Sequence, residues 1–454
     1  MSTMEQLPVA IIGAGPIGLA AAANLAKRGV PFRVFEAGEA VGANVRDWGH
    51  VRIFTPWAQS VDQVSRGLLE GSGWKLPEAC ALPTGDDLCD RYLEPLAALP
   101  LLSGSIETKA RVVAITRRGI DKVASKDRGK RPFTLRIADR AGRERWVPAR
   151  AVIDASGTWQ NPNPLGGSGI EADGEAATRG HLAYGMPDVL GKERSRYEGR
   201  HVAVVGAGYS AINVLLDLVQ LGKCAATWVV RGRNMTRIYG GGDSDQLAAR
   251  GKLGQHLRAL VEGGRIKLVT GFATKEVAKT RDGLVLTGDI DHRTVSLAPV
   301  DGIIVATGQR PDLAMTRELR LELDPWLEST KALGPMIDPN LHSCGSVEPH
   351  GHRETSHPEP GFYTIGVKSY GRAPTFLLLT GYEQARSVAA ALAGDMFAAD
   401  DVHLVLPDTG ICVTDFEEAD CCGGPAPAKD DACCLADAVA KDTGKEGCAC
   451  GDRA

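Results

Sequence analysis

The sequence has no large excess of basic residues, and this argues against partners that are bound through negative charge. Its 52 lysines and arginines nearly balance its 56 aspartates and glutamates, for a formal net charge of −4 at pH 7. A protein that binds nucleic acid or an anionic membrane surface through charge needs a basic excess. We therefore expect neither nucleic acid nor a membrane among the partners.

The sequence also lacks a basic stretch in front of its first long apolar run. That run, VAIIGAGPIGLAAAANLA from Val9, is interrupted by glycines and a proline, which argues against both a signal peptide and a membrane helix. We therefore expect a cytoplasmic protein. In a reducing compartment its cysteines are expected to be thiols, available for metal binding or redox work.

The same apolar run has the pattern of a strand, a tight turn and a helix. Gly13, Gly15 and Gly18 follow the expected strand Val9–Ile12 at the spacing that lets backbone approach a pyrophosphate at a helix N-terminus. The next apolar segment ends in Glu36, where a carboxylate accepts hydrogen bonds from a ribose diol. The motif predicts a dinucleotide site, and the glutamate favours a free 2′-hydroxyl.

A second motif of this kind follows the expected strand HVAVV. Its small residues are Gly206, Gly208, Ser210 and Ala211. The next strand ends in Arg231 and Arg233 in place of an acid. A guanidinium binds a 2′-phosphate through a rigid, permanently charged fork, so this motif predicts NADPH. The alternative for the two arginines is a solvated loop.

Four ordered motifs over about residues 8–394 resemble the flavoproteins that have one FAD-binding and one NADPH-binding Rossmann-like domain. Besides the two glycine motifs, DASGTW contains Gly157 and VATGQRPD contains Gly308, both similar to signatures where the chain crosses between domains. GFYTIG ends in Gly366 and precedes a helix whose N-terminus, by this resemblance, faces the flavin. The resemblance implies FAD at the first motif, NADPH at the second, and cofactor contacts from these three glycines.

The resemblance also implies an α/β fold in which the NADPH domain is inserted into the FAD domain. We expect the FAD-binding domain over 1–165 and 296–407, the NADPH-binding domain over 166–295, and a flexible cysteine-rich tail over 408–454. Before the first crossing, an alternating pattern predicts a β-meander. Its basic loop, Arg117 to Arg131, is expected to be solvated.

Cysteine is absent from the stretch Val41 to Trp57, where some disulfide reductases of this architecture carry a redox pair. Others carry it in the NADPH domain, where this chain has only Cys224, which we expect to be a small buried hydrophobe. The spacing of Cys80 and Cys89 matches neither pattern. The sequence therefore favours a flavin monooxygenase, in which NADPH reduces the flavin and dioxygen supplies an oxygen atom to a soft substrate atom.

Candidates for catalysis come from the segment that should pass the flavin: Arg46, Trp48 and His50. A buried polar turn is the alternative for all three. His181 and Tyr184, in RGHLAYGMPD, stand where related monooxygenases carry a longer fingerprint, here with shortened spacing. A surface loop is an equal alternative for His181.

Six of the eleven cysteines lie near the C-terminus, among almost no large apolar side chains: Cys421, Cys422, Cys433, Cys434, Cys448 and Cys450. Neighbouring thiols present several soft sulfurs to one thiophilic ion, whereas adjacent cysteines do not easily form a disulfide with each other. Body and tail together resemble the flavin-binding monooxygenases of bacterial arsenic-resistance operons. That resemblance implies that these cysteines bind a trivalent metalloid and that the body oxidises it or another soft substrate.

Other readings of the tail stay open. It is a relay for an NADPH-dependent thiol-disulfide or metal-ion reductase, a metal-binding module on an enzyme of unrelated substrate, a zinc site, or a segment with incidental cysteines. The expected partners are a small-molecule or metalloid substrate and dioxygen, and a homo-oligomer stays open.

Overall fold

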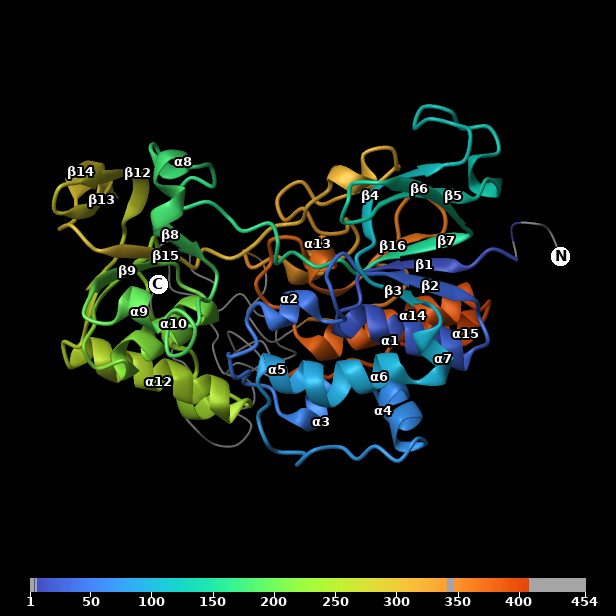
Figure 1. The fold of residues 1–454 in the computed structure, drawn as a ribbon, viewed down its shortest axis with the longest axis horizontal. Helices are drawn as coiled ribbons and strands as arrows, with labels where there is room; N and C mark the ends of the chain where they lie inside the picture. Colours follow the sequence, from blue (N-terminus) through green and yellow to red (C-terminus); the bar gives the residue numbers. More distant parts are fainter. Residues whose placement is uncertain (1–3, 5, 341–346, 408–454) are drawn as a thin grey trace, which may run out of the picture. The chain divides into compact units, whose positions relative to one another are not determined.

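The computed structural model describes residues 4, 6–340 and 347–407, and the six tail cysteines lie outside these residues (Figure 1). The chain forms two compact units. The first contains the described residues of Met1–Asn161, Gln309–Ile337 and Glu348–Leu406. The second contains Pro162–Gly308 together with the described residues of 338–347 and residue 407.

The first unit is built on a five-stranded parallel sheet. Its order is β16 (Phe362–Thr364), β7 (Ala151–Asp154), β1 (Val9–Ile12), β2 (Phe32–Phe35) and β3 (Ile106–Glu107). Alternate residues of β1 enter two cores: Val9 and Ile11 pack with the helices, Ala10 and Ile12 with the small sheet on the other face. Both faces are therefore covered, which explains why β1 has no polar residue.

The helices of the first unit are, in chain order, α1 (Pro16–Lys27), α2 (Ala43–Arg46), α3 (Trp57–Ser60), α4 (Gln63–Glu70), α5 (Gly85–Leu88), α6 (Glu94–Ala98), α7 (Pro100–Ser103), α13 (Gly334–Ile337), α14 (Leu378–Leu392) and α15 (Met396–Asp400). The two long ones, α1 and α14, pack against each other beneath the strands in Figure 1. The alanine-rich sequence of α1 permits this close approach, because its small side chains are buried.

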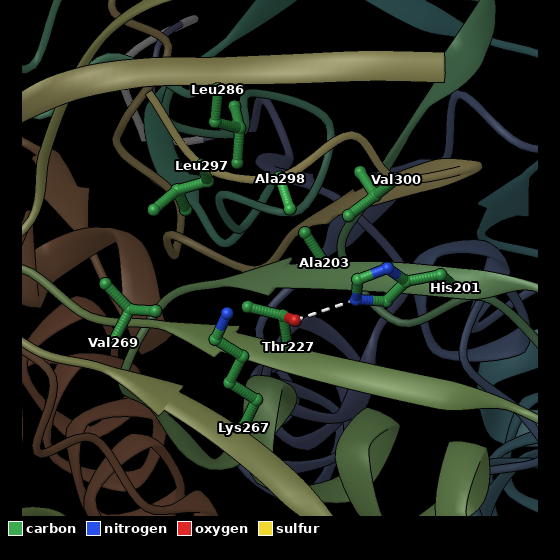
Figure 2. Close-up of a pocket in the computed structure, with 9 residues that line it drawn as sticks. All are labelled: His201, Ala203, Thr227, Lys267, Val269, Leu286, Leu297, Ala298 and Val300. Carbon is green, nitrogen blue, oxygen red and sulfur yellow. Dashed lines mark hydrogen bonds between the residues drawn. The ribbon is translucent and has the colours of Figure 1, made fainter. Parts of the chain in front are cut away.

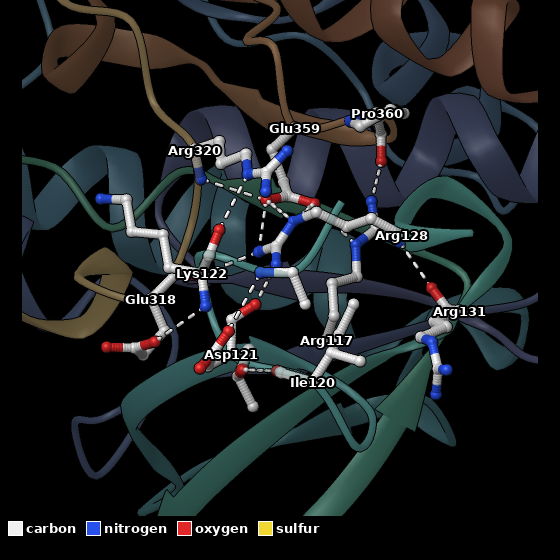
Figure 3. Close-up of polar contacts among 12 residues, drawn as sticks. Arg117, Ile120, Asp121, Lys122, Arg128, Arg131, Glu318, Arg320, Glu359 and Pro360 are labelled. Carbon is white, nitrogen blue, oxygen red and sulfur yellow. Dashed lines mark hydrogen bonds and ion pairs between the residues drawn. The ribbon is translucent and has the colours of Figure 1, made fainter. Parts of the chain in front are cut away.

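The predicted β-meander is confirmed as an antiparallel sheet of β4 (Arg111–Arg117), β5 (Phe133–Ala138) and β6 (Glu144–Ala149). The expectation of a solvated basic loop is wrong for two of its arginines. Arg117 and Arg128 are only 1% and 4% exposed, and both pair with the buried carboxylate of Glu359 (Figure 3). The Arg117 guanidinium also lies 3.6 Å from the centre of the Phe133 ring. A partner distant in sequence therefore makes their burial tolerable.

The second unit contains a parallel sheet and an antiparallel one. The parallel order is β11 (Ile266–Val269), β10 (Ala225–Val229), β9 (His201–Val205), β15 (Gly302–Val305) and β8 (Leu182–Tyr184). The antiparallel sheet is β12 (Ala273–Thr280), β13 (Gly283–Ile290) and β14 (Arg293–Ser296). Alternate residues of β9 again enter two cores, Val202 and Val204 toward α10 and Ala203 and Val205 toward the antiparallel sheet.

The helices of the second unit are α8 (Glu175–Thr178), α9 (Arg194–Tyr197), α10 (Tyr209–Gln220), α11 (Thr236–Tyr239) and α12 (Ala248–Glu262). Both units thus carry a strand, a glycine turn and a helix at the centre of a parallel sheet, as expected for two Rossmann-like domains. Across the described ranges of the chain, no helix has the length and apolarity that a membrane crossing requires.

Candidate functional site

The first glycine turn joins β1 to α1. Two of its glycines are required by close packing, and the third faces open space. Gly13 has φ +95°, and a Cβ there would lie 2.8 Å from the carbonyl oxygen of Ala155. A Cβ on Gly18 would lie 2.0 Å from the carbonyl oxygen of Gly13. A Cβ on Gly15, by contrast, would meet no atom within 4 Å. Packing therefore requires glycine at positions 13 and 18, whereas the open space at Gly15 fits a ligand that approaches the backbone.

The N-termini of the long helices at the two glycine turns carry no side-chain cap. α1 begins after Gly15 and α10 after Gly208, and neither cap residue provides a side-chain hydrogen bond. A side chain fills this role at some other helices, as Asp62 does for α4 and Thr84 for α5, whereas α12 and α14 are uncapped as well. Uncapped amide groups at a helix N-terminus suit an anionic phosphate. Both turns therefore fit the pyrophosphate of a dinucleotide.

Glu36 follows β2 and lies beside the first turn. One carboxylate oxygen accepts a hydrogen bond from the backbone N–H of Ala14 at 2.7 Å, and the other from Gly38 at 2.7 Å. These two contacts fix the side chain. Each carboxylate oxygen accepts more than one hydrogen bond, so the predicted contact with a ribose diol is compatible with them.

Gly157 and Gly366 lie around the first turn. Both have φ +72°, and their nearest neighbours come from the same cluster: Val367 beside Gly157, and Ile17 of α1 beside Gly366. The structure thus brings these two predicted residues together with Gly13, Gly15 and Gly18. They line one edge of the sheet, at the carboxyl ends of β1, β7 and β16.

The second glycine turn has the same division of roles. Gly206 has φ +139°, and a Cβ there would lie 2.1 Å from the carbonyl oxygen of Ala306, whereas a Cβ on Gly208 would meet nothing within 4 Å. Ser210 and Ala211 lie in the first turn of α10, where Ala211 is fully buried. Gly308 belongs to this unit as well, close to Asn163.

Arg231 and Arg233 follow β10 and are exposed. Arg231 donates a hydrogen bond of 2.7 Å to the carbonyl oxygen of Gly167, and Arg233 forms an ion pair with Asp291. A guanidinium has five N–H donors, so either contact leaves donors that a phosphate can accept from. Their role at a 2′-phosphate stays a prediction.

Arg46 is held by acids rather than left open to a substrate. Its guanidinium pairs with three carboxylates, those of Asp86, Asp90 and Glu94. The hydrogen bond that it donates to Asp90 raises the pKa of Arg46 above its ordinary value. These contacts fasten α2 to α5 and to the segment that follows it.

Trp48 and His50 follow α2. The Trp48 ring lies 6.5 Å from that of Trp159, at an angle of 60°. The Nε2 atom of His50 is buried and has no hydrogen-bond partner among the described residues. Of the three catalytic candidates, His50 is thus the one with a buried polar atom that lacks a partner among the described residues and that a ligand can satisfy.

His181 and Tyr184 each contact a neighbouring side chain of the second unit. His181 is exposed, with its Nε2 atom 3.0 Å from Nζ of Lys279. Tyr184 donates a 2.6 Å hydrogen bond to the buried Glu175, and burial together with this neighbour raises the pKa of Tyr184. Both contacts serve local structure.

Three cysteines belong to the described residues, all as free thiols: exposed Cys80, buried Cys89 and half-buried Cys224. Burial raises the pKa of Cys89 to about 12 and that of Cys224 to about 11, so both stay protonated and unreactive near neutral pH. Throughout the described ranges, no three His, Cys, Asp or Glu side chains are arranged to hold a metal ion.

Two hollows lie outside the glycine turns. The first lies in the second unit, where His201, Thr227 and Lys267 share a lining with apolar side chains (Figure 2). It offers about 20 Å³ to the centre of a water molecule, which is room for one water. The second is an open groove of about 550 Å³ in the first unit, where Lys331 pairs with Glu322 and Arg353 with Asp400.

Lys368 of the first unit is a further buried charge that the sequence did not predict. Lys368 is 3% exposed and lies in the 3₁₀ turn Gly366–Tyr370, with its Nζ atom 2.8 Å from Asp154. A single lysine between a valine and a serine gives no signal of burial in a sequence. Its acidic partner, within DASGTW, was the only available hint.

Comparison with known proteins adds a family and a fold. The family described as pyridine nucleotide-disulphide oxidoreductase matches residues 7–353. Ferredoxin–NADP reductase of Rhodospirillum rubrum is 24% identical over 405 residues, which cover 88% of this chain and 95% of the relative.

Solved structures of different activities share the fold. Bacillithiol disulfide reductase from Bacillus cereus has a TM-score of 0.63 at 19% identity, covering 86% of this chain and 99% of its own. The flavin-containing monooxygenase from Stenotrophomonas maltophilia has a TM-score of 0.53 at 18% identity, covering 86% and 98%. At such identities the likeness shows the fold alone, so it does not distinguish a reductase from a monooxygenase.

Proposed function

The chain belongs to the pyridine nucleotide-disulphide oxidoreductase family, and from that premise we propose that it is a flavin monooxygenase for a soft substrate of the arsenite class. As an oxidoreductase of this family it uses FAD and NADP(H). We assign FAD to the first glycine turn and NADPH to the second. The proposal therefore concerns the electron acceptor and the substrate.

The observation that carries the proposal is the chemistry of the described thiols. A disulfide reductase needs two cysteines that exchange electrons with the flavin. In the described part of the first unit, Cys80 is exposed, whereas Cys89 is buried with its pKa raised to about 12. This arrangement supports dioxygen, rather than a disulfide within the body, as the electron acceptor.

Bound FAD and NADPH would supply the redox chemistry: NADPH provides two electrons, one atom of dioxygen enters the substrate, and the other leaves as water after taking up one proton from solution. The residues of the chain bind and orient these groups. Gly15 and Glu36 bind the phosphate and ribose of one cofactor, and Arg231 and Arg233 bind the 2′-phosphate of the other. His50 provides a buried polar atom that remains to be satisfied.

The substrate class follows from the tail thiols, which lie outside the described residues. Six cysteines among the last residues are soft donors, and a trivalent metalloid prefers such donors to oxygen. We infer that these cysteines capture the metalloid before its oxidation by the flavin domain.

Oxygen consumption tests the proposal directly. Purified protein loaded with FAD is given NADPH in air, with and without arsenite, and the arsenic product is identified. We expect the substrate to accelerate NADPH oxidation and to appear as an oxygenated product in a one-to-one ratio with the NADPH consumed. NADPH oxidation that ignores arsenite and yields only hydrogen peroxide contradicts the proposal.

A second candidate is a reductase in which the tail cysteines carry electrons to a disulfide or a metal ion. The density of thiols between residues 421 and 450 favours it. Truncation before Asp415 separates the two candidates. A relay loses nearly all turnover on truncation, whereas a capture segment mainly raises the apparent KM for the metalloid.

A further inference from the structure

A buried ion pair lies at the carboxyl edge of the first unit's parallel sheet. Nζ of Lys368 is 2.8 Å from Oδ2 of Asp154, which is 1% exposed. Ser156 contacts both residues: its hydroxyl donates to Oδ1 of Asp154 at 2.7 Å and accepts from Nζ of Lys368 at 3.1 Å. The backbone N–H of Ser156 also donates to Oδ1, at 3.1 Å. We call these three residues the polar triangle.

The polar triangle lies directly behind the first glycine turn. Asp154 ends β7, and Lys368 follows β16, the neighbouring strand. A Cβ on Gly13 would lie 3.1 Å from Cα of Ser156 and 2.8 Å from the carbonyl oxygen of Ala155. The position of residues 155–157 therefore sets how closely this segment approaches the first glycine turn. Both lie at the edge where parallel sheets bind their ligands.

Stability does not explain why this site is charged. Taking an ammonium and a carboxylate out of water offsets most of their attraction, and an apolar pair of similar size is often at least as stable. The ion pair together with the three hydrogen bonds of Ser156 does, however, favour one geometry, because a displacement separates buried charges from their partners. The triangle is thus suited to fixing position.

We propose that Lys368, Asp154 and Ser156 are positioning residues for FAD. They hold residues 155–157 against the glycine turn, and the ammonium behind the turn favours the anionic cofactor. This inference rests on the proposed FAD site of the first unit. It predicts that the triangle determines how tightly FAD is bound, beyond any effect on the stability of the cofactor-free fold.

The mildest test is Ser156→Ala in the full chain, which keeps both charges and removes only the hydroxyl. We expect its dissociation constant for FAD to rise about ten- to a hundred-fold, because hydrogen bonds to two charged groups are lost. Ser156→Thr keeps the hydroxyl and should restore most of the affinity.

A double substitution, Asp154→Asn with Lys368→Met, removes both charges together so that neither remains alone. Its matched control is Asp245→Asn with Arg250→Met in the second unit, where another buried pair has Nε and Oδ2 2.7 Å apart. We expect weaker FAD binding only in the first double variant, with the melting temperature of the FAD-free protein close to that of the wild type.

Several outcomes would overturn the inference while the proposed function stands. They are wild-type FAD affinity in Ser156→Ala, no recovery in Ser156→Thr, or weaker binding that simply follows a lower melting temperature of the FAD-free protein. If the double variant does not fold, the two serine variants decide. If the wild-type chain itself binds no FAD, the proposed function fails, and this inference fails with it.

Discussion

The indole N–H of Trp228 donates a hydrogen bond of 2.7 Å to the carbonyl oxygen of Gly206. Trp228 lies in β10 and is fully buried, so it supports the second glycine turn from beneath. We predict that Trp228→Phe raises KM for NADPH about five-fold, because the ring is kept but the turn loses its hydrogen bond. Steady-state kinetics and the FAD content of the purified protein measure the effect.

The control for this variant is Trp146→Phe, at an exposed tryptophan of the first unit. It should leave KM for NADPH as it is. Loss of FAD from Trp228→Phe, with KM for NADPH unchanged, would contradict the assignment of the second turn to NADPH.

Gly15→Leu should yield protein without flavin. Open space surrounds the added side chain in the cofactor-free fold, so the protein should fold, but the leucine occupies the approach to the pyrophosphate. Gly67→Leu is a matched control, because Gly67 also has nothing within 4 Å and lies in the exposed part of α4. Flavin absorbance per protein is the readout. Equal flavin content in the two variants would refute the assignment.

Arg231→Ala with Arg233→Ala should lower kcat/KM for NADPH about ten- to a hundred-fold and change that for NADH little. The expected loss is that of charge-assisted contacts to a 2′-phosphate, which NADH lacks. Arg258→Ala removes an exposed arginine of α12 and serves as the control. Equal losses with both nucleotides would mean that the arginines act through their contacts with Gly167 and Asp291.

Because His357 is buried, we expect the protein to lose free energy of unfolding in acid. Burial lowers the pKa of this histidine from 6.5 to about 4, and its Nε2 atom lies 3.0 Å from the hydroxyl oxygen of Thr364. The unfolded chain binds the proton near pH 6.5 and the folded chain only near pH 4. The free energy of unfolding should therefore fall by about 3 kcal/mol as the pH drops through this window, and this contribution should be level below it.

Denaturant titrations between pH 7 and pH 4 measure this slope. His357→Gln should remove the contribution of His357, although burial also lowers the pKa of His350, whose share of the slope remains. His256→Gln, at an exposed position of α12, is the control. A slope that is the same in His357→Gln and the wild type would show that His357 is not buried as a neutral side chain.

Local patterns predicted the elements of this protein better than its distant contacts. The glycine motifs indicated two Rossmann-like units, and the expected cofactors FAD and NADP(H) are confirmed by the family. Each motif is contiguous in the sequence, so its local structure can be predicted without knowledge of distant contacts. The assigned site residues, the domain limits and the monooxygenase activity stay predictions.

Buried charges were the main failure of prediction, for a physical reason. Arg117 lies 242 residues from Glu359 in the sequence, and Lys368 lies 212 residues from Ser156. A cluster of basic residues is normally solvated, and only knowledge of the distant carboxylate would have reversed that expectation. Sequence periodicity holds no information about such pairs.

The order of the strands along the chain has a consequence for synthesis on the ribosome. The parallel sheet of the second unit is complete once β15 has emerged, whereas the first unit still awaits β16. Until Glu359 is made, Arg117 and Arg128 also lack the carboxylate that makes their burial tolerable. We therefore expect the nascent chain to finish its internal unit first and to keep the N-terminal one incomplete, and hence open to chaperones, for longer.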